Sequence, residues 1–250
     1  MTAYDRTPFL LRLSVRSADA QIELAASTLL DKIRHKLSIS ELPLPLPIDQ
    51  WIETPLGYDF SIVGNNELDS DVLGLARPTL NQILIHESLL EHEGRFRFTC
   101  AHELGHCILH KAIAEELSDA ELPRSGKTSK IEHEADRFAS SILMPLNTLT
   151  GQLAKVMQDH HLSSSCVEVL RGDDVRTVWI WRRCILPALC DTYGVSRAAM
   201  AYRFRELRLP GQRRILKPSM ISLMVAPEKA LIKLPLDRIS VHDGVPVLTE

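Results

Sequence analysis

Two histidines and a glutamate stand close together in the segment His102-Glu103-Leu104-Gly105-His106. On a helix, residues four apart differ by about 6 Å along the axis and about 40° around it, so both imidazoles project from one face. Two such nitrogens can occupy adjacent positions of a tetrahedral zinc site, with metal–nitrogen distances of about 2.0–2.1 Å. Glu103 is rotated by roughly 100° from His102, which is too far for a ligand but close enough to take a proton from water at the open metal position. The spacing predicts an H-E-x-x-H metallopeptidase site, with His102 and His106 as ligands and Glu103 as the catalytic base.

The competing interpretation is a surface helix that carries two histidines without a metal. Phe98, Leu104 and Ile108 argue against it, because apolar residues at these positions indicate that the helix is packed. Buried histidines beside a buried glutamate need a partner, and a metal ion would supply it.

A third protein ligand must come from elsewhere in the chain. His110 is four residues beyond His106, but about 12 Å of axial rise separates it from His102 on a straight helix. We therefore expect His110 to be a polar residue near the helix end. Glu132 is the favoured third ligand, because Asp136 lies on the same helical face and can accept a hydrogen bond from the far nitrogen of a ligand histidine.

His133 and Glu134 remain alternatives for the third ligand. If Glu134 is not a ligand, we expect it to form a solvated charged face with Lys130 or Arg137. The same helix carries an apolar face that would press it onto the first metal helix: Ala135, Phe138, Ala139, Ile142 and Leu143.

The elements that must position these residues follow from periodicity and from helix breakers. Apolar side chains at three- and four-residue spacing from Ile22 to Ile33 predict a helix that Ser17 caps. The proline-rich residues 42–47 read as an extended connector. Short β-like runs predict strands at residues 58–63, 72–76 and 82–86. Helices are expected at residues 96–114, 131–144 and 175–209, the last broken by Pro187 and Gly194, with an exposed loop at residues 117–130.

Composition excludes several classes of protein. The 250 residues are 45% hydrophobic and 24% charged with a net charge of -3, which is ordinary for a globular chain and points to no particular partner. Five cysteines without a C-x-x-C pair fit a reducing compartment better than a disulfide framework. The apolar run at Pro8 is too short for a secretory signal, and no stretch has the length to cross a bilayer. We therefore expect a cytoplasmic protein with no membrane partner.

Two blocks of the chain resemble the ImmA/IrrE-type metallopeptidases. The first runs from Arg97 to His110 and contains A-H-E-L-G-H, and the second runs from Glu132 to Pro145 and contains E-H-E-A-D-R-F-A-S-S-I-L-M-P. The match is close over residues 83–145 and looser over residues 42–57. The two blocks together are far more specific than the five-residue motif alone.

The resemblance implies His102, His106 and Glu132 as metal ligands and Glu103 as base, in a zincin-like core with a small sheet over the metal helices. It implies that an extended substrate adds to an edge strand, for which residues 82–86 are the candidate. Some members of this family cut a helix-turn-helix repressor and so switch on stress-response or mobile-element genes. Zinc is the expected metal, with manganese as the alternative.

Residues 189–200 look like a helix-turn-helix unit, in which Gly194 permits the turn and Ser196 caps the next helix. That helix carries basic residues which a DNA reader would place on phosphates: Arg197, Arg203, Arg205 and Arg208. We favour a helical hairpin packed on the peptidase core, because apolar and aromatic residues of the same segment indicate packing: Tyr202, Phe204 and Leu207.

The sequence thus predicts an α+β protein with three parts: a zincin-like metallopeptidase domain at residues 1–160, a helical, helix-turn-helix-like region at residues 161–212 and an extension of unknown structure at residues 213–250. The leading hypothesis is a metal-dependent endopeptidase of narrow specificity that cleaves a helix-turn-helix repressor. The rivals are a DNA-binding regulator and a toxin–antitoxin or phage partner, each with a structural metal site. Glu103 argues against both rivals, because a structural zinc site does not need it. His160, His161 and Tyr202 are candidates for the oxyanion donor, and none of them is preferred.

Overall fold

The computed structural model describes residues 12–69, 71–112, 117–118 and 127–249. The chain forms two compact units. The first, here called the motif unit, comprises Ser17–Pro145 and Cys190–Ala199. The second, here called the C-terminal unit, includes Leu146–Leu189, the residues from Met200 onward and the described part of the segment that ends at Arg16. Helices combined with small sheets confirm the α+β class, and the boundaries at residues 160 and 212 stay predictions.

Three helices of the motif unit overlap the predicted ones with shifted ends, and a fourth, at Ile48–Glu53, was not predicted. They are α1 (Ala20–Leu37), α2 (Ile48–Glu53), α3 (Glu93–Leu109) and α4 (Lys127–Leu143), with short 3-10 helices at Ser17–Asp19 and Glu87–Glu91. Ser17 does not cap α1: the N-cap is Asp19, and it makes no side-chain capping bond. The expected loop at residues 117–130 is also partly wrong. Leu117–Ser118 form β4 and α4 begins at Lys127, while residues 119–126 lie outside the described part.

The sheet of the motif unit has the strand order β1-β3-β2-β4. Its strands are β1 (Asp59–Val63), β2 (Gly74–Arg77), β3 (Gln82–His86) and β4 (Leu117–Ser118). β1 runs parallel to β3, whereas β2 is antiparallel to both β3 and β4. The prediction that residues 82–86 form an edge strand is therefore wrong, because β3 lies between β1 and β2.

The burial of β3 explains its central place. Ile83, Leu84 and Ile85 are all buried, so both faces of this strand are covered. Leu84 and its partner Leu75 join a small cluster on one face with Val63, Leu68 and Val72. Since strand residues alternate between faces, Ile83 and Ile85 point to the opposite face. A continuous apolar run is typical of a strand buried on both sides, and it was the signal against an edge position.

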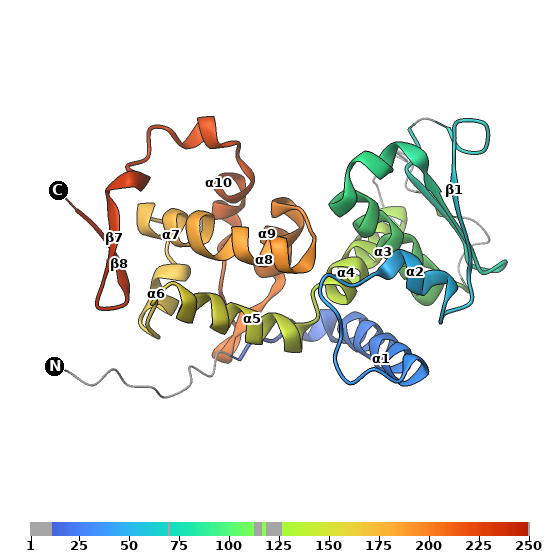
Figure 1. Ribbon diagram of the computed structural model, residues 1–250, viewed down its shortest axis with the longest axis horizontal. Coiled ribbons are helices and arrows are strands. Elements are labelled where there is room, and N and C mark those ends of the chain that lie inside the picture. The colour runs from blue at the N-terminus through green and yellow to red at the C-terminus, as the bar shows by residue number, and fades with distance from the viewer. Residues whose placement is uncertain (1–11, 70, 113–116, 119–126, 250) are drawn as a thin grey trace. The chain divides into compact units, whose positions relative to one another are not determined.

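Helix α3 lies against strands β2 and β3, and α4 packs along α3 with α1 beyond it (Figure 1). The predicted packing face of α4 is confirmed, since all five of its residues are buried. Polar contacts join α4 to α1: Arg137 pairs with Asp19 at 2.7 Å, and the Ser141 hydroxyl donates to Glu23 at 2.8 Å. The helix that carries Glu132 is thus held from both sides.

The C-terminal unit is mainly helical. Its helices are α5 (Leu146–Asp159), α6 (Cys166–Leu170), α7 (Val175–Trp179), a π-helical stretch (Ile180–Ile185) and α10 (Ile221–Val225), with 3-10 helices at Pro210–Gln212, Pro218–Met220, Glu228–Leu231 and Leu236–Arg238. Two hairpins complete it, β5 (Arg208–Leu209) with β6 (Arg213–Arg214) and β7 (Ile239–His242) with β8 (Val245–Leu248). The fully buried Trp181 and Phe204 meet edge to face at 4.8 Å in its core. The predicted break at Pro187 is wrong, because helical structure continues through this residue. A π-helical stretch precedes it and alters the hydrogen-bond pattern that a proline disrupts.

Two further helices, α8 (Leu186–Tyr193) and α9 (Arg197–Glu206), flank the turn expected near Gly194. Gly194 has a φ of 60°, and the Ser196 hydroxyl accepts from the Ala199 amide at 3.1 Å, as predicted. Arg97 of α3 donates to the Gly194 carbonyl at 3.1 Å. The turn is therefore packed against the first turns of the motif helix.

Candidate metal centre

His102, His106 and Glu132 bring their ligand atoms to a common point. The two Nε2 atoms lie 3.0 Å apart, and the Glu132 carboxylate oxygens lie 3.2 Å from His102 Nε2 and 3.5 Å from His106 Nε2. His106 is fully buried and His102 nearly so, while Glu132 is partly exposed. The predicted third ligand is thus the one that the fold brings to the histidines. Among the described residues, no grouping of His, Cys, Asp and Glu side chains with this geometry includes His133 or Glu134.

The spacing and chemistry of the triad fit a divalent metal ion. Four ligands at about 2.0–2.1 Å around a tetrahedral ion lie about 3.3–3.4 Å from one another. The observed separations of 3.0, 3.2 and 3.5 Å bracket that value. Two imidazole nitrogens and a carboxylate are also the donor set that zinc takes in hydrolytic sites.

The far nitrogen of His102 contacts a carboxylate. His102 Nδ1 lies 3.0 Å from Asp136 Oδ1, one turn beyond Glu132 on α4. Because a carboxylate only accepts, this contact assigns a hydrogen to Nδ1 and directs the other ring nitrogen to the triad. The predicted contact between Asp136 and the far nitrogen of His102 is present.

His110 lies at the helix end, as expected, and it is also buried. It is the C-cap of α3 and is 1% exposed, and its ring centroid lies 5.2 Å from that of His106 with the two planes tilted by 51°. Its Nδ1 lies 3.0 Å from His106 Nδ1, and its Nε2 lies 3.2 Å from Glu134 Oε2. The expected ion pair of Glu134 with Lys130 exists at 3.6 Å, but Glu134 is not a purely solvated residue, because it also contacts buried His110.

The electrostatics of the triad favour a positive charge at its centre. Burial alone lowers the pKa of His102, but hydrogen bonds to Asp136 and Glu132 and the charge of Glu103 outweigh burial and raise that pKa to about 10. Burial raises the pKa of Glu132, yet hydrogen bonds from the two histidines bring it down to about 2. Burial lowers the pKa of His106. A proton satisfies this preference in the metal-free protein, and a cation would replace it.

Glu103 lies beneath the sheet and is fully buried. A Cβ built on Gly74 of β2 would stand 2.5 Å from Glu103 Oε1 and 2.8 Å from Thr99 Cγ2. Only a glycine therefore lets the strand approach this carboxylate so closely. Sequence reasoning did not identify Gly74, because nothing in the strand pattern shows which residue faces Glu103.

Gly105, the fourth residue of the motif, has a comparable role between the two helices. An added Cβ there would lie 3.1 Å from Phe138 Cδ1 and 3.4 Å from the Ala135 Cα. Because Gly105 has no Cβ atom, α4 can approach α3 closely, and Glu132 of α4 can lie next to the two histidines.

The family comparison agrees with this geometry. The model of the Peptidase_M78 family, described as the IrrE N-terminal-like domain, matches residues 66–205, more than half of the chain. The chain belongs to the Peptidase_M78 family. The matched region contains all three triad residues and Glu103, and the predicted ImmA/IrrE resemblance is confirmed. Membership suggests a metallopeptidase and implies a metal. No curated protein matches the chain.

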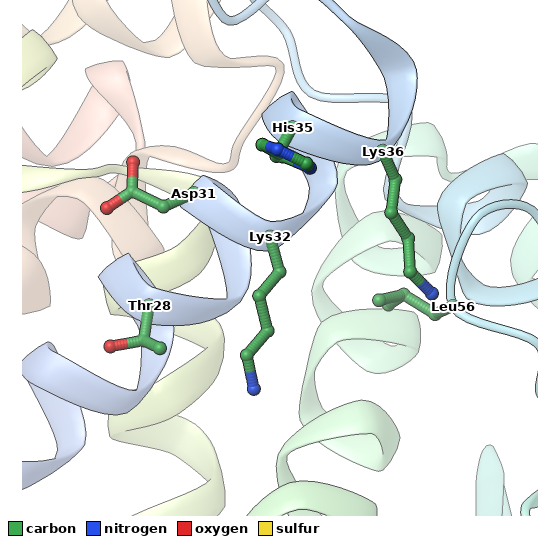
Figure 2. Close-up of a pocket in the computed structure, with 6 residues that line it drawn as sticks. All are labelled: Thr28, Asp31, Lys32, His35, Lys36 and Leu56. Carbon is green, nitrogen blue, oxygen red and sulfur yellow. The ribbon is translucent and has the colours of Figure 1, made fainter.

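A hollow of about 470 Å³ lies beside α1, away from the triad residues of this Peptidase_M78 protein. It is lined by Thr28, Asp31, Lys32, His35, Lys36 and Leu56. Figure 2 shows these side chains diverging rather than converging on one point. We assign this hollow no chemistry.

Three residues were candidates for the oxyanion donor: His160, His161 and Tyr202. They belong to the C-terminal unit, so their candidacy stays a prediction. Within the described part of the chain, every helix is too short or too polar to cross a membrane.

Proposed function

We propose that this protein is a zinc-dependent endopeptidase with a zincin-like core. The observation that carries the proposal is the meeting of His102 Nε2, His106 Nε2 and the Glu132 carboxylate beside the buried Glu103. A purely structural site would be expected to close its fourth position with a protein ligand. Here three ligands and an adjacent carboxylate match the catalytic arrangement instead.

The metal in this proposal is zinc. His102, His106 and Glu132 would hold it, and two nitrogens with one carboxylate suit zinc better than manganese, which prefers a larger share of oxygen ligands. When bound, such an ion polarises a peptide carbonyl and lowers the pKa of water. Manganese remains the alternative.

The protein's own residues supply the proton transfers and the support. Glu103 accepts a proton from the attacking water and then delivers it to the leaving amine. Its burial under β2 keeps bulk water from the carboxylate and fixes its position through Gly74. Asp136 holds the ring of His102, so that the ligand nitrogen faces the reaction centre.

The proposed substrate is a helix-turn-helix repressor, whose cleavage would derepress stress-response or mobile-element genes. This step rests on family resemblance alone. The helix-turn-helix-like region formed by α8 and α9 is proposed as a structural hairpin rather than a DNA reader. Arg203 and Arg208 are buried, and the Arg208 guanidinium donates to three backbone carbonyls, of Arg205, Glu206 and Leu207. Two of the four expected phosphate ligands are therefore engaged inside the fold.

Purified protein incubated with the helix-turn-helix repressor encoded beside its gene tests the proposal. We expect cleavage that a chelator abolishes, zinc restores and Glu103→Gln slows by roughly 100–10,000-fold, with metal content unchanged by mass spectrometry. Glu53→Gln is the matched control, because Glu53 is an exposed residue of α2. This variant should cleave the repressor as fast as the parent protein. An intact repressor, together with salt-sensitive duplex binding that survives Glu103→Gln, would instead identify a DNA-binding regulator.

A further inference from the structure

We infer that His110 and Glu134 form a positioning pair that holds His106 as a metal ligand through its Nε2 atom. The inference rests on the metal site of the proposed function and extends it to two residues outside the triad. Both residues act through His106, so neither is a ligand or a catalytic residue.

Three groups form a continuous chain that leads away from the triad. His106 Nδ1 lies 3.0 Å from His110 Nδ1, and His110 Nε2 lies 3.2 Å from Glu134 Oε2. The His106 side chain is 0% exposed and that of His110 is 1% exposed, whereas Glu134 reaches 30%. The hydrogen-bonded series thus runs from a buried histidine to a partly exposed carboxylate.

The carboxylate at the end fixes the direction of every hydrogen bond in the chain. Ionised Glu134 can only accept, so His110 Nε2 must donate to it. The remaining nitrogen of a neutral His110 then presents a lone pair to His106 Nδ1. His106 must donate from Nδ1, which leaves the lone pair of its Nε2 pointing to the triad.

The reversed arrangement shows why Glu134 matters. If His110 donated from Nδ1, its Nε2 lone pair would face the Glu134 carboxylate at 3.2 Å, and the two acceptors would repel each other. His106 would then carry its hydrogen on Nε2 and direct an N–H at the metal position. Without the lone pair of His110 Nδ1, the Nδ1 hydrogen of a correctly oriented His106 would lose this acceptor and face the cost of an unmade hydrogen bond.

The two ligand histidines are therefore held by different devices. His102 reaches its carboxylate, Asp136, directly, and His106 reaches Glu134 only through a second imidazole. The interposed ring is needed because His106 is one helical turn farther along α3, and α4 supplies no carboxylate to its Nδ1 atom among the contacts of the described residues. Sequence spacing alone excluded His110 as a ligand and left this role unseen.

Metal affinity tests the inference without any use of catalysis. Zinc binding to the full-length protein is measured by competition with a chromophoric chelator, and cobalt is used as a spectroscopic probe of ligand geometry. We expect His110→Phe, which keeps a ring but removes the acceptor, to weaken zinc binding roughly 10–100-fold, as for other outer contacts of metal ligands. The cobalt absorption bands should shift. His110→Asn retains an oxygen acceptor and should recover part of the affinity.

A double mutant separates positioning from general destabilisation. Glu134→Gln should weaken binding by roughly tenfold on its own. In combination with His110→Phe it should add little, because Glu134 acts through His110. His92→Phe is the matched control, since His92 is exposed at the start of the same helix and should leave both metals bound as in the parent.

The outcomes distinguish the two proposals. A parent protein that binds neither zinc nor cobalt would overturn the proposed function itself. A parent that binds both, with a folded His110→Phe variant of equal affinity and unchanged cobalt bands, would overturn only the positioning pair. If His110→Phe does not fold, Glu134→Gln decides, because its side chain is partly exposed, and unchanged zinc affinity in that variant would reject the inference.

Discussion

Buried polar side chains are used in opposite ways in the two units. In the motif unit, His102, His106 and Glu132 bring potential metal-ligand atoms together, at separations of 3.0 to 3.5 Å. In the C-terminal unit, the Arg182 guanidinium donates to the carbonyls of Leu223, Met224 and Ala226 and pairs with Glu228. The hydrogen-bonding groups of Arg182 are satisfied by the protein itself. The triad, in contrast, favours a bound cation.

The difference shows how a functional site can be told from structural polarity. Donors matched to acceptors inside a fold contribute to stability and need no ligand. Acceptors that converge on one point remain costly until a proton or a metal joins them. The comparison predicts that substitutions at or around the triad of the motif unit change metal binding or turnover, whereas substitutions of buried polar residues in the C-terminal unit change stability.

The largest effect is expected from a substitution within the triad. Glu132→Gln keeps the shape of the side chain but removes the charge, and it should weaken zinc binding by more than about 100-fold, beyond the range of outer contacts. Chelator competition measures the change. Glu228→Gln is the corresponding change in the C-terminal unit and should leave zinc affinity unaltered, and equal losses in both variants would contradict the comparison.

A smaller effect is expected where β2 meets Glu103, the proposed catalytic base. The new methyl group of Gly74→Ala would displace the Glu103 carboxylate, since that side chain is more easily moved than the strand. Turnover should fall roughly 10–100-fold while zinc affinity stays near that of the parent. A steady-state assay with measured metal content checks this.

Gly151→Ala serves as the control for Gly74→Ala. A Cβ at Gly151 meets no atom within 4 Å, and the residue lies inside α5. It should leave turnover unchanged and raise the free energy of unfolding by about 0.5–1 kcal/mol. A comparable loss of turnover in this variant would show that Gly74 has no special relation to Glu103.

The C-terminal unit should respond in stability alone. Arg182→Met leaves buried backbone carbonyls without their donor and should lower the free energy of unfolding by about 2 kcal/mol. Zinc affinity of the folded variant should match the parent. Denaturant unfolding of the chelated protein measures the first quantity, and a loss of zinc binding by folded Arg182→Met would erase the proposed division between the units.

The smallest expected effect is the dependence of zinc affinity on pH. At neutral pH the metal-free protein holds a proton on His102, whose pKa is raised to about 10, while Glu132, with its pKa lowered to about 2, is ionised. Because burial lowers the pKa of His106, that ring is already neutral. Zinc must then displace one proton, so affinity should rise about tenfold per pH unit between pH 7 and 8. Titration calorimetry in buffers of different ionisation enthalpy should detect one proton released per ion, and a pH-independent affinity would be inconsistent with these shifts.

Local patterns predicted most of the motif unit. The spacing of His102 and His106, the shared face of Glu132 and Asp136 and the apolar stripe of α4 all depend on helical periodicity, which acts over a few residues. Each of these expectations agrees with the structure. Errors arose where the outcome depended on distant partners, as with β3, whose neighbours on both sides decide whether it is an edge.

The sequence by itself determined the residue types of the candidate metal centre, their helical faces and the family to which the chain belongs. Tertiary structure alone decided that His110 and Glu134 reach His106, that Gly74 lies over Glu103, and that Arg203 and Arg208 are enclosed within the fold. These are contacts between elements far apart in the chain or sums over all neighbours of a residue. Periodicity specifies which way a side chain points from its own helix, but packing specifies what it meets there.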